Sequence, residues 1–358
     1  MSTTFWMFPE GVAKLTAQLD RAREDAAQAK AHVTRHCALS LGQVGLLPDT
    51  FGATGVHKKA VALVERTLGN LAARIEYVVE GVRASVDDYQ TADDESSRVF
   101  GALEALLPPS GSLPPSYLRY GLTFPGISFS DLAEPTAVLR DPGTGEKEPW
   151  SFDPVSLDWV NPTSYVRTFI QEVTGRDPFQ QVTLALSGDW MLFQRVGFVW
   201  VQIGTFCEQL GKNLARAAYD LRDVWKGREA EAAERYILAL ANATTDFAQL
   251  CRQLVARYSN AATAAEEFNE FAAGLLADVV ANALLGIATK VASAATPPAM
   301  RVAANTALAL LAARIVLQLK WLNDKYEIYQ NALGLAATWV NNTEFTGLDP
   351  LIAERSLR

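Results

Sequence analysis

The chain has 358 residues, of which 49% are hydrophobic, and its 40 acidic and 32 basic side chains give a net charge of −8. This length accommodates two or three domains with a sizeable core. The acidic balance, without a basic face or stripe, excludes a general nucleic-acid-binding role. Cys37, Cys207 and Cys251 are an odd number without Cys-x-x-Cys spacing, and each falls in a helical pattern. They are expected to be buried, reduced thiols.

Residues 1–104 contain two apolar stripes with spacings of three and four, the pattern of helices that bury one face. Pro9 can occupy the first turn of the first helix. A glycine-rich break, LGQVGLLPDTFGATG, separates the two stripes. We therefore interpret 1–104 as a helical hairpin. Its stripe residues are Val12, Leu15, Leu19, Ala22, Ala26, Ala29 and Val33, then Val64, Leu68, Leu71, Ile75, Val78 and Val82.

Proline density marks residues 105–160 as a connector. Ten of the sixteen prolines lie between Pro108 and Pro162, which forbids long helices there. The same segment carries several Tyr, Phe and Trp residues, and a purely flexible linker would not hold so many aromatic side chains. We expect the connector to lie against the rest of the protein.

Residues 161–341 are expected to form a second helical domain, followed by a tail at 342–358. Asn161-Pro162 and Asp177-Pro178 are start signals for two short helices. A seven-residue rhythm then predicts two long helices that lie along partner helices and meet near residue 225. The stripe consists of Phe193, Val196, Trp200, Ile203, Cys207, Leu210, Leu214, Ala217, Leu221 and Val224, then Ala230, Ala233, Ile237, Leu240, Thr244, Phe247, Cys251, Leu254, Tyr258, Ala261, Ala265, Phe268, Ala272, Leu275 and Val279.

Three glycines on the first of these long helices recur every seven residues, at Gly197, Gly204 and Gly211. Because a helical glycine costs about 1 kcal/mol relative to alanine, the repeat indicates a face that another backbone approaches closely. Three glycines tolerated by chance are the alternative interpretation.

Residues 275–295 and 302–319 are apolar enough to raise a membrane hairpin, separated by Thr296-Pro297-Pro298. Asp278, Lys290 and Arg314 lie within them, and a charge at a bilayer centre costs about 2.5–3.5 kcal/mol. We expect a buried helical hairpin rather than a stable membrane span, with insertion after a conformational change left open.

No residue pattern favours catalysis or a cofactor, so we expect a protein that is not an enzyme. His32 and His36 have metal-ligand spacing on one helix face, but basic neighbours and the lack of a nearby glutamate favour solvated or loop-facing histidines. Neither a nucleophile elbow nor a phosphate loop is present in the sequence. The carboxylates are expected to be solvated, including Glu229 in the first turn of its helix.

Two short patterns remain, and each could arise by chance. Trp225-x-Gly227 falls in the turn between the two long helices, within LRDVWKGREAEAAERYILAL. Tyr89-x-x-x-Asp93 falls near the end of the first hairpin, within GVRASVDDYQTADDESS. Their positions make them candidates for a function, because one marks the turn of a hairpin and the other marks an open end.

These motifs resemble those of the WXG superfamily of type VII (ESX) secretion substrates, and their order resembles fused PE–PPE-like substrates and the WXG-like N-terminal domains of actinobacterial toxins. The resemblance covers both hairpins. It implies an all-α, elongated four-helix bundle with an extra C-terminal helix. It also implies that Trp225, partly exposed, and Gly227 lie near Tyr89 and Asp93 as a composite signal for the secretion ATPase. The first hairpin lacks a Trp-x-Gly pattern, which is consistent with one signal shared between the halves.

The resemblance further implies synthesis in the cytoplasm and export to the medium or cell surface, where the protein acts as a scaffold or carrier. The N-terminus lacks the basic and apolar regions of a general secretory signal. Two alternatives stay open. One is an intracellular adaptor that binds a toxin, a small WXG protein or a second copy of itself through the glycine-spaced face, and the other is a membrane-active oligomer after export.

Overall fold

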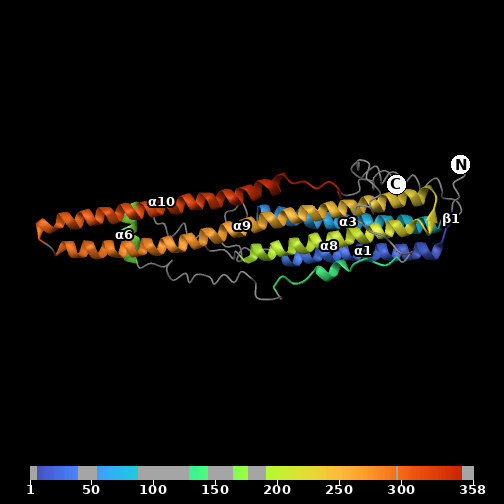
Figure 1. The fold of residues 1–358 in the computed structure, drawn as a ribbon, viewed down its shortest axis with the longest axis horizontal. Coiled ribbons are helices and arrows are strands. Elements are labelled where there is room, and N and C mark those ends of the chain that lie inside the picture. Colours follow the sequence, from blue (N-terminus) through green and yellow to red (C-terminus); the bar gives the residue numbers. More distant parts are fainter. Residues whose placement is uncertain are drawn as a thin grey trace.

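A computed structural model of the chain describes residues 6–38, 55–87, 129–143, 164–175, 191–295 and 297–348. These residues are predominantly helical, and the only sheet among them is one pair of two-residue strands. The all-α prediction is confirmed at this level. Figure 1 shows that the long helices run nearly parallel to one axis of an elongated molecule.

The first two long helices, α1 (Pro9–His36) and α3 (Val56–Asp87), pack against each other as an antiparallel pair. Arg23 faces Glu76 across the pair, with 3.2 Å between Arg23 Nη1 and Glu76 Oε1, and Asp20 faces Arg83. Pro9 occupies the first turn of α1, as its fixed φ angle and missing N–H predict. The end of α3 therefore lies at the same end of the molecule as the start of α1 (Figure 1).

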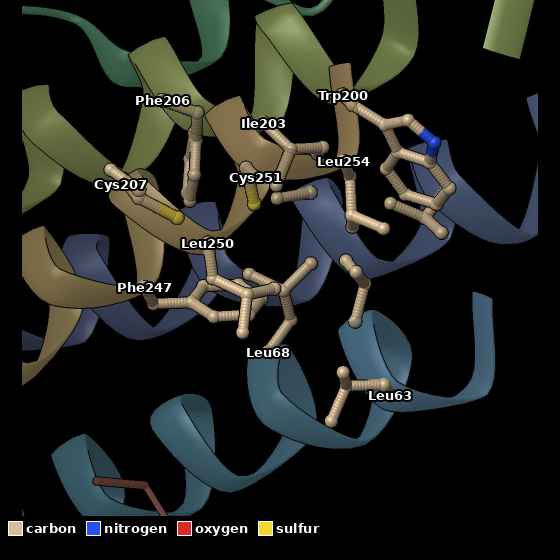
Figure 2. Close-up of a cluster of buried hydrophobic side chains, with 14 of the residues drawn as sticks. Leu63, Leu68, Trp200, Ile203, Phe206, Cys207, Phe247, Leu250, Cys251 and Leu254 are labelled. Carbon is tan, nitrogen blue, oxygen red and sulfur yellow. The ribbon is translucent and has the colours of Figure 1, made fainter. Parts of the chain in front are cut away.

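The second pair consists of α8 (Met191–Leu221) and α9 (Arg228–Ala294), joined by the turn that contains strand β2 (Trp225–Lys226). At 1.5 Å per residue, the 67 residues of α9 extend about 100 Å. α8 also packs against α1, and α9 packs against α3. The hydrophobic residues of these helices meet along their shared length, as the cluster around Trp200, Phe206 and Phe247 illustrates (Figure 2).

The predicted stripes form the core. Every stripe residue named above is buried, apart from Phe193, whose side chain is outside the described set. The spacing of three and four therefore identified the inward face of α1, α3 and α8, and of α9 as far as Val279. The three cysteines are also free and buried, as expected.

The connector is described only over residues 129–143, and this part lies against α1 and α8 around a short helix, η1 (Pro135–Val138). Asn213 of α8 binds its backbone: Asn213 Oδ1 accepts from the N–H of Leu132 at 2.8 Å, and Nδ2 donates to the carbonyl of Ala133 at 2.9 Å. Arg21 of α1 pairs with Asp131, with 2.7 Å between Nε and Oδ2. Side chains from both hairpins thus fix this segment.

The far part of the molecule contradicts the prediction of a buried hairpin over 275–319. Here α9 and α10 (Pro298–Asn342) run together past the ends of the other long helices, with the short helix α6 (Ser164–Thr174) beside them (Figure 1). The most apolar 18-residue window of α9 is 33% buried, and that of α10 is 11% buried. The sequence pattern was that of a core helix, but too few described elements pack here to cover it.

The final part of α10 returns to the first hairpin. Lys59 Nζ of α3 donates to Asn341 Oδ1 at 2.8 Å, and Asn70 Nδ2 donates to the carbonyl of Leu348 at 2.7 Å. The ring of Phe345 also approaches Phe247 of α9, with 5.2 Å between the ring centroids. The last helix is therefore tied to the other helices at its C-terminal end.

Candidate functional site

The turn between α8 and α9 is built around Trp225 and Gly227. After α8 ends at Leu221, the N–H of Val224 still donates to the carbonyl of Leu221, at 3.1 Å. Gly227 then adopts φ 136° and ψ 177° as the residue that precedes α9. Residues that carry a side chain rarely adopt this φ. Glycine therefore permits the chain to reverse here, as the sequence indicated.

The N-terminal segment completes the turn, a feature that the sequence analysis missed. Strand β1 (Trp6–Met7) pairs with β2 in antiparallel fashion, so that Met7 lies opposite Trp225 and Trp6 opposite Lys226. The pairing continues into the next residue, because the N–H of Phe8 donates to the carbonyl of Val224 at 2.7 Å. A strand of two residues is too short to produce a periodic pattern in the sequence.

Gly11, in the first turn of α1, lets the segment lie this close to the turn. A Cβ atom added at Gly11 would be 2.4 Å from Val224 Cγ1 and 2.6 Å from Val224 Cβ. Val224 is branched at Cβ and has little freedom to move away. The close approach of α1 to the turn therefore requires glycine at position 11.

Trp225 itself is buried, with 1% of its surface exposed, which contradicts the expectation of a partly exposed aromatic. The strand pair and the core cover it because the N-terminal segment lies over the turn. The exposed aromatic side chains at this end are Trp6 (37%) and Phe8 (50%). Lys226 Nζ lies 5.9 Å from the centre of the Trp6 ring, a cation–π distance.

The first turn of α9 also departs from the sequence expectation. Glu229 is 2% exposed rather than solvated, although its place in the first turn is the one that the helix dipole favours for a carboxylate. Arg222 bridges the turn from the other side, with 2.7 Å between its Nε and Glu234 Oε1. These side chains fix how α8 leads into α9.

Tyr89 and Asp93, the other half of the predicted signal, lie outside the described residues. The helix that precedes them ends at Asp87, two residues before Tyr89. That helix end lies at the same end of the molecule as β1 and β2 (Figure 1). α3 therefore ends at the end of the molecule that contains the Trp225 turn.

The three regularly spaced glycines are buried on the side of α8 that meets α9. A Cβ atom at Gly204 would be 3.5 Å from the carbonyl oxygen of Ala248, and one at Gly197 would be 3.7 Å from Tyr258 Cβ. Gly211 is buried as well. The backbone that approaches the glycine-spaced face is thus α9 of the same chain.

Two histidines are buried, His57 and His32, and the burial of His32 contradicts the expectation that it is solvated or loop-facing. His57 Nε2 donates to the carbonyl of Cys37 at 2.8 Å, so Nδ1 accepts from the hydroxyl of Tyr258 at 2.7 Å. His32 Nε2 donates to Gln202 Oε1 at 2.7 Å. Burial lowers the pKa of both imidazoles, against the opposing effect of these hydrogen bonds. They connect helices as neutral side chains.

Burial also raises the pKa of all three cysteine thiols. Since the thiolate is the nucleophilic form, this environment suppresses cysteine reactivity. His32 and His36 are neighbours, with 4.5 Å between ring centroids, and within the described part of the chain no group of three or more His, Cys, Asp or Glu residues could hold a metal ion.

The most distinctive local geometry is therefore the junction of β1, β2 and the start of α9. It combines a buried tryptophan, a glycine with a conformation that other residues rarely adopt, and an exposed pair of aromatic side chains beside a lysine. Comparison with protein-family models, curated proteins and solved structures finds no match to this chain.

Proposed function

We propose that the protein is a non-enzymatic substrate of a type VII secretion system, exported in the folded state to act as a scaffold or carrier. The observation that carries this proposal is the Trp225–Gly227 turn at the junction of two long antiparallel helices. In the proposed arrangement α1, α3, α8 and α9 form a four-helix bundle of the WXG kind, which the contacts between these helices support.

The proposed signal consists of the turn, the Tyr89–Asp93 segment and the N-terminal strand. In this proposal Trp225 is a positioning residue, because its ring is buried in the core rather than facing a receptor. The surface that the secretion ATPase reads is then Trp6, Phe8 and Lys226, together with Tyr89 and Asp93. Support comes from the end of α3, which leads toward this end of the molecule.

A separate helical partner, such as a toxin or a small WXG protein, is the other candidate. It would bind a surface other than the glycine-spaced face of α8, because α9 already covers Gly197 and Gly204. The geometry therefore gives more support to the export substrate than to the adaptor that the sequence left open.

Secretion from a host with and without its type VII ATPase tests the proposal. Export is expected to require the ATPase and to fall at least about tenfold with Trp6→Ala or Tyr89→Ala, whereas Phe198→Ala, an exposed aromatic far from the turn, serves as the matched control. Trp225→Phe keeps an aromatic ring in the core and tests positioning. Export that survives both Trp225→Ala and Tyr89→Ala rejects the composite signal, and export without the ATPase rejects the route.

A further inference from the structure

The distal arm, defined as residues 271–323, carries an unusual share of the exposed apolar surface. Sixteen large hydrophobic side chains are exposed among the described residues, and half of them lie on this arm. Val302, for example, is 70% exposed and Leu310 is 67% exposed. The eight are Leu284, Leu285, Val291, Val302, Leu310, Val316, Leu317 and Trp321.

Both helices of the arm are long and apolar enough to cross a bilayer, with best 18-residue windows of mean hydropathy 1.9 in α9 and 1.7 in α10. Core helices of soluble proteins can be as long and as apolar, but they are mostly buried. These windows are only 33% and 11% buried. Exposed apolar surface of this extent marks interaction sites when it is contiguous.

The net charge of the arm favours an anionic partner. Its ionisable side chains are Asp278, Lys290, Arg301, Arg314 and Lys320, a net charge of +3. The rest of the chain then has 28 basic and 39 acidic side chains, a net charge of −11. With opposite net charges, the arm is attracted to an anionic surface and the rest of the protein is repelled by it.

Several uncharged polar groups of the arm are hydrogen-bonded within it, as a low-dielectric environment favours. Asn282 Nδ2 of α9 donates to Gln318 Oε1 of α10 at 3.0 Å, and both side chains are buried between the helices. The hydroxyls of Thr289 and Thr306 donate to backbone carbonyls one turn earlier, those of Leu285 and Val302. An interhelical amide pair of this kind keeps two helices together in lipid.

Two of the three basic residues on the arm's part of α10 are separated by about the thickness of a bilayer, and the third, Arg314, lies between them, six residues from Lys320. Arg301 near the tip and Lys320 near the base are nineteen residues apart, about 28 Å in a helix. The hydrocarbon core of a bilayer is roughly 30 Å thick. Trp321 beside Lys320 is half exposed, and tryptophan favours the headgroup region of a membrane.

We infer that the distal arm is a lipid-binding helical hairpin that inserts into anionic phospholipid bilayers. Its base, with Lys320 and Trp321, lies at the near headgroups. Its tip, with Lys290 and Arg301, enters first, and long basic side chains extend from it toward phosphate groups. In the structure Lys290 pairs with Glu172 of α6, with 2.9 Å between Nζ and Oε2, so a lipid phosphate competes with that carboxylate.

Flotation of the purified full chain with vesicles tests this inference without any secretion machinery, so its failure is separate from that of the proposed export. Binding is expected to vesicles of equal parts phosphatidylglycerol and phosphatidylcholine, and at least about tenfold weaker to phosphatidylcholine alone. Leu285→Gln/Leu310→Gln should weaken binding at least tenfold. Ile328→Gln/Leu335→Gln, on α10 at similarly exposed positions outside the arm, is the matched control.

Arg314→Gln/Lys320→Gln is expected to lower affinity for the anionic vesicles about tenfold or more and to reduce its dependence on salt. A fluorophore on Leu285→Cys should report an apolar environment with anionic vesicles, whereas one on Phe198→Cys should not. Equal loss in the arm and control pairs, or no flotation at all, overturns the inference. Self-association in sedimentation that depends on Leu285 and Leu310, without vesicle binding, assigns the arm to contacts between copies instead.

Discussion

The backbone N–H of Phe8 donates a 2.7 Å hydrogen bond to the carbonyl of Val224, and this contact joins the first residues of the chain to the turn between α8 and α9. The turn is therefore not completed by α8 and α9 alone. Both hairpins contribute to it, which makes its integrity sensitive to substitutions far apart in the sequence.

Gly11→Ala is expected to lower the free energy of unfolding by about 1–3 kcal/mol, since the new Cβ atom would overlap Val224. Urea denaturation measures the effect. Gly274→Ala, in α9 with no heavy atom within 4 Å of the added Cβ, is the control and should be neutral or stabilising by up to about 1 kcal/mol. Equal effects of the two substitutions would contradict the close approach of α1 to the turn.

Trp225→Ala is expected to cost about 3–5 kcal/mol of stability, because it removes a fully buried aromatic side chain. Trp6→Ala, on the paired strand, should cost less than about 1 kcal/mol because Trp6 is partly exposed. Thermal unfolding of the two variants compares them directly. A small effect of Trp225→Ala would mean that the turn does not depend on its tryptophan.

The buried His57 imidazole predicts that the protein loses stability in acid. Burial lowers the pKa of His57 in the folded protein, so the unfolded chain binds a proton first as the pH falls below about 6.5. Stability is therefore full above this pH and declines below it. His57→Gln should flatten the dependence of stability on pH below about 6.5, with His36→Gln as the control for loss of an imidazole. Unfolding curves at a series of pH values give the comparison.

Asp25 should act in the opposite direction. Burial, and then the nearby Asp131, raise its pKa to about 6, while Arg21 opposes the shift and Glu134 and Glu24 add to it. Its contribution to stability is full below pH about 4 and is lost as the pH rises through about 6. Because the side chain is partly exposed, Asp25→Asn should stabilise the protein at pH 7 by only about 1 kcal/mol.

Asp324→Asn, on the surface of α10, is the matched control for the Asp25 variant. The difference between the two variants is expected at pH 7 and should vanish near pH 4, where Asp25 is protonated in the folded state. A constant difference across this range would show that the Asp25 carboxyl does not titrate as proposed.

Asn213→Ala should release the connector from α8, since the Asn213 amide binds the backbone of Leu132 and Ala133. We expect limited proteolysis within 129–143 to accelerate severalfold, and stability to fall by about 1–3 kcal/mol through the loss of buried hydrogen bonds. Thr245→Ala, which removes a hydroxyl that donates to the carbonyl of Ala241 in α9, is a suitable comparison. Unchanged cleavage would mean that other contacts hold the segment.

The sequence predicted the helices well where helices pack on helices. Spacing alone identified the buried face of α8 from Val196 to Leu221, because a seven-residue repeat requires a partner along its length. It failed over 280–319, because hydropathy reports what a segment can bury and not what covers it. The exposure of Leu310 depends on how far the neighbouring helices extend, which no local pattern records.

The candidate site also has one part that could be predicted from the sequence and one part that could not. Gly227 was predicted from its place between two periodic segments, and its backbone conformation requires glycine. Trp225 is paired with Met7, which lies more than two hundred residues earlier in the chain. A contact of this range, formed by a strand of two residues, leaves no periodic signal that a reading of the sequence could detect.

The same range of contact has a consequence for the order of folding. α1 and α3 can associate once residue 87 is synthesised, and α8 and α9 can begin to associate as α9 emerges. The pairing of residue 6 with residue 226, by contrast, closes a loop of more than two hundred residues between the two hairpins. Long-range pairs form late because they must overcome the entropy of loop closure. We therefore expect the strand pair to form only in chains whose two halves have both folded. A formed strand pair at the turn then indicates that the two hairpins have assembled.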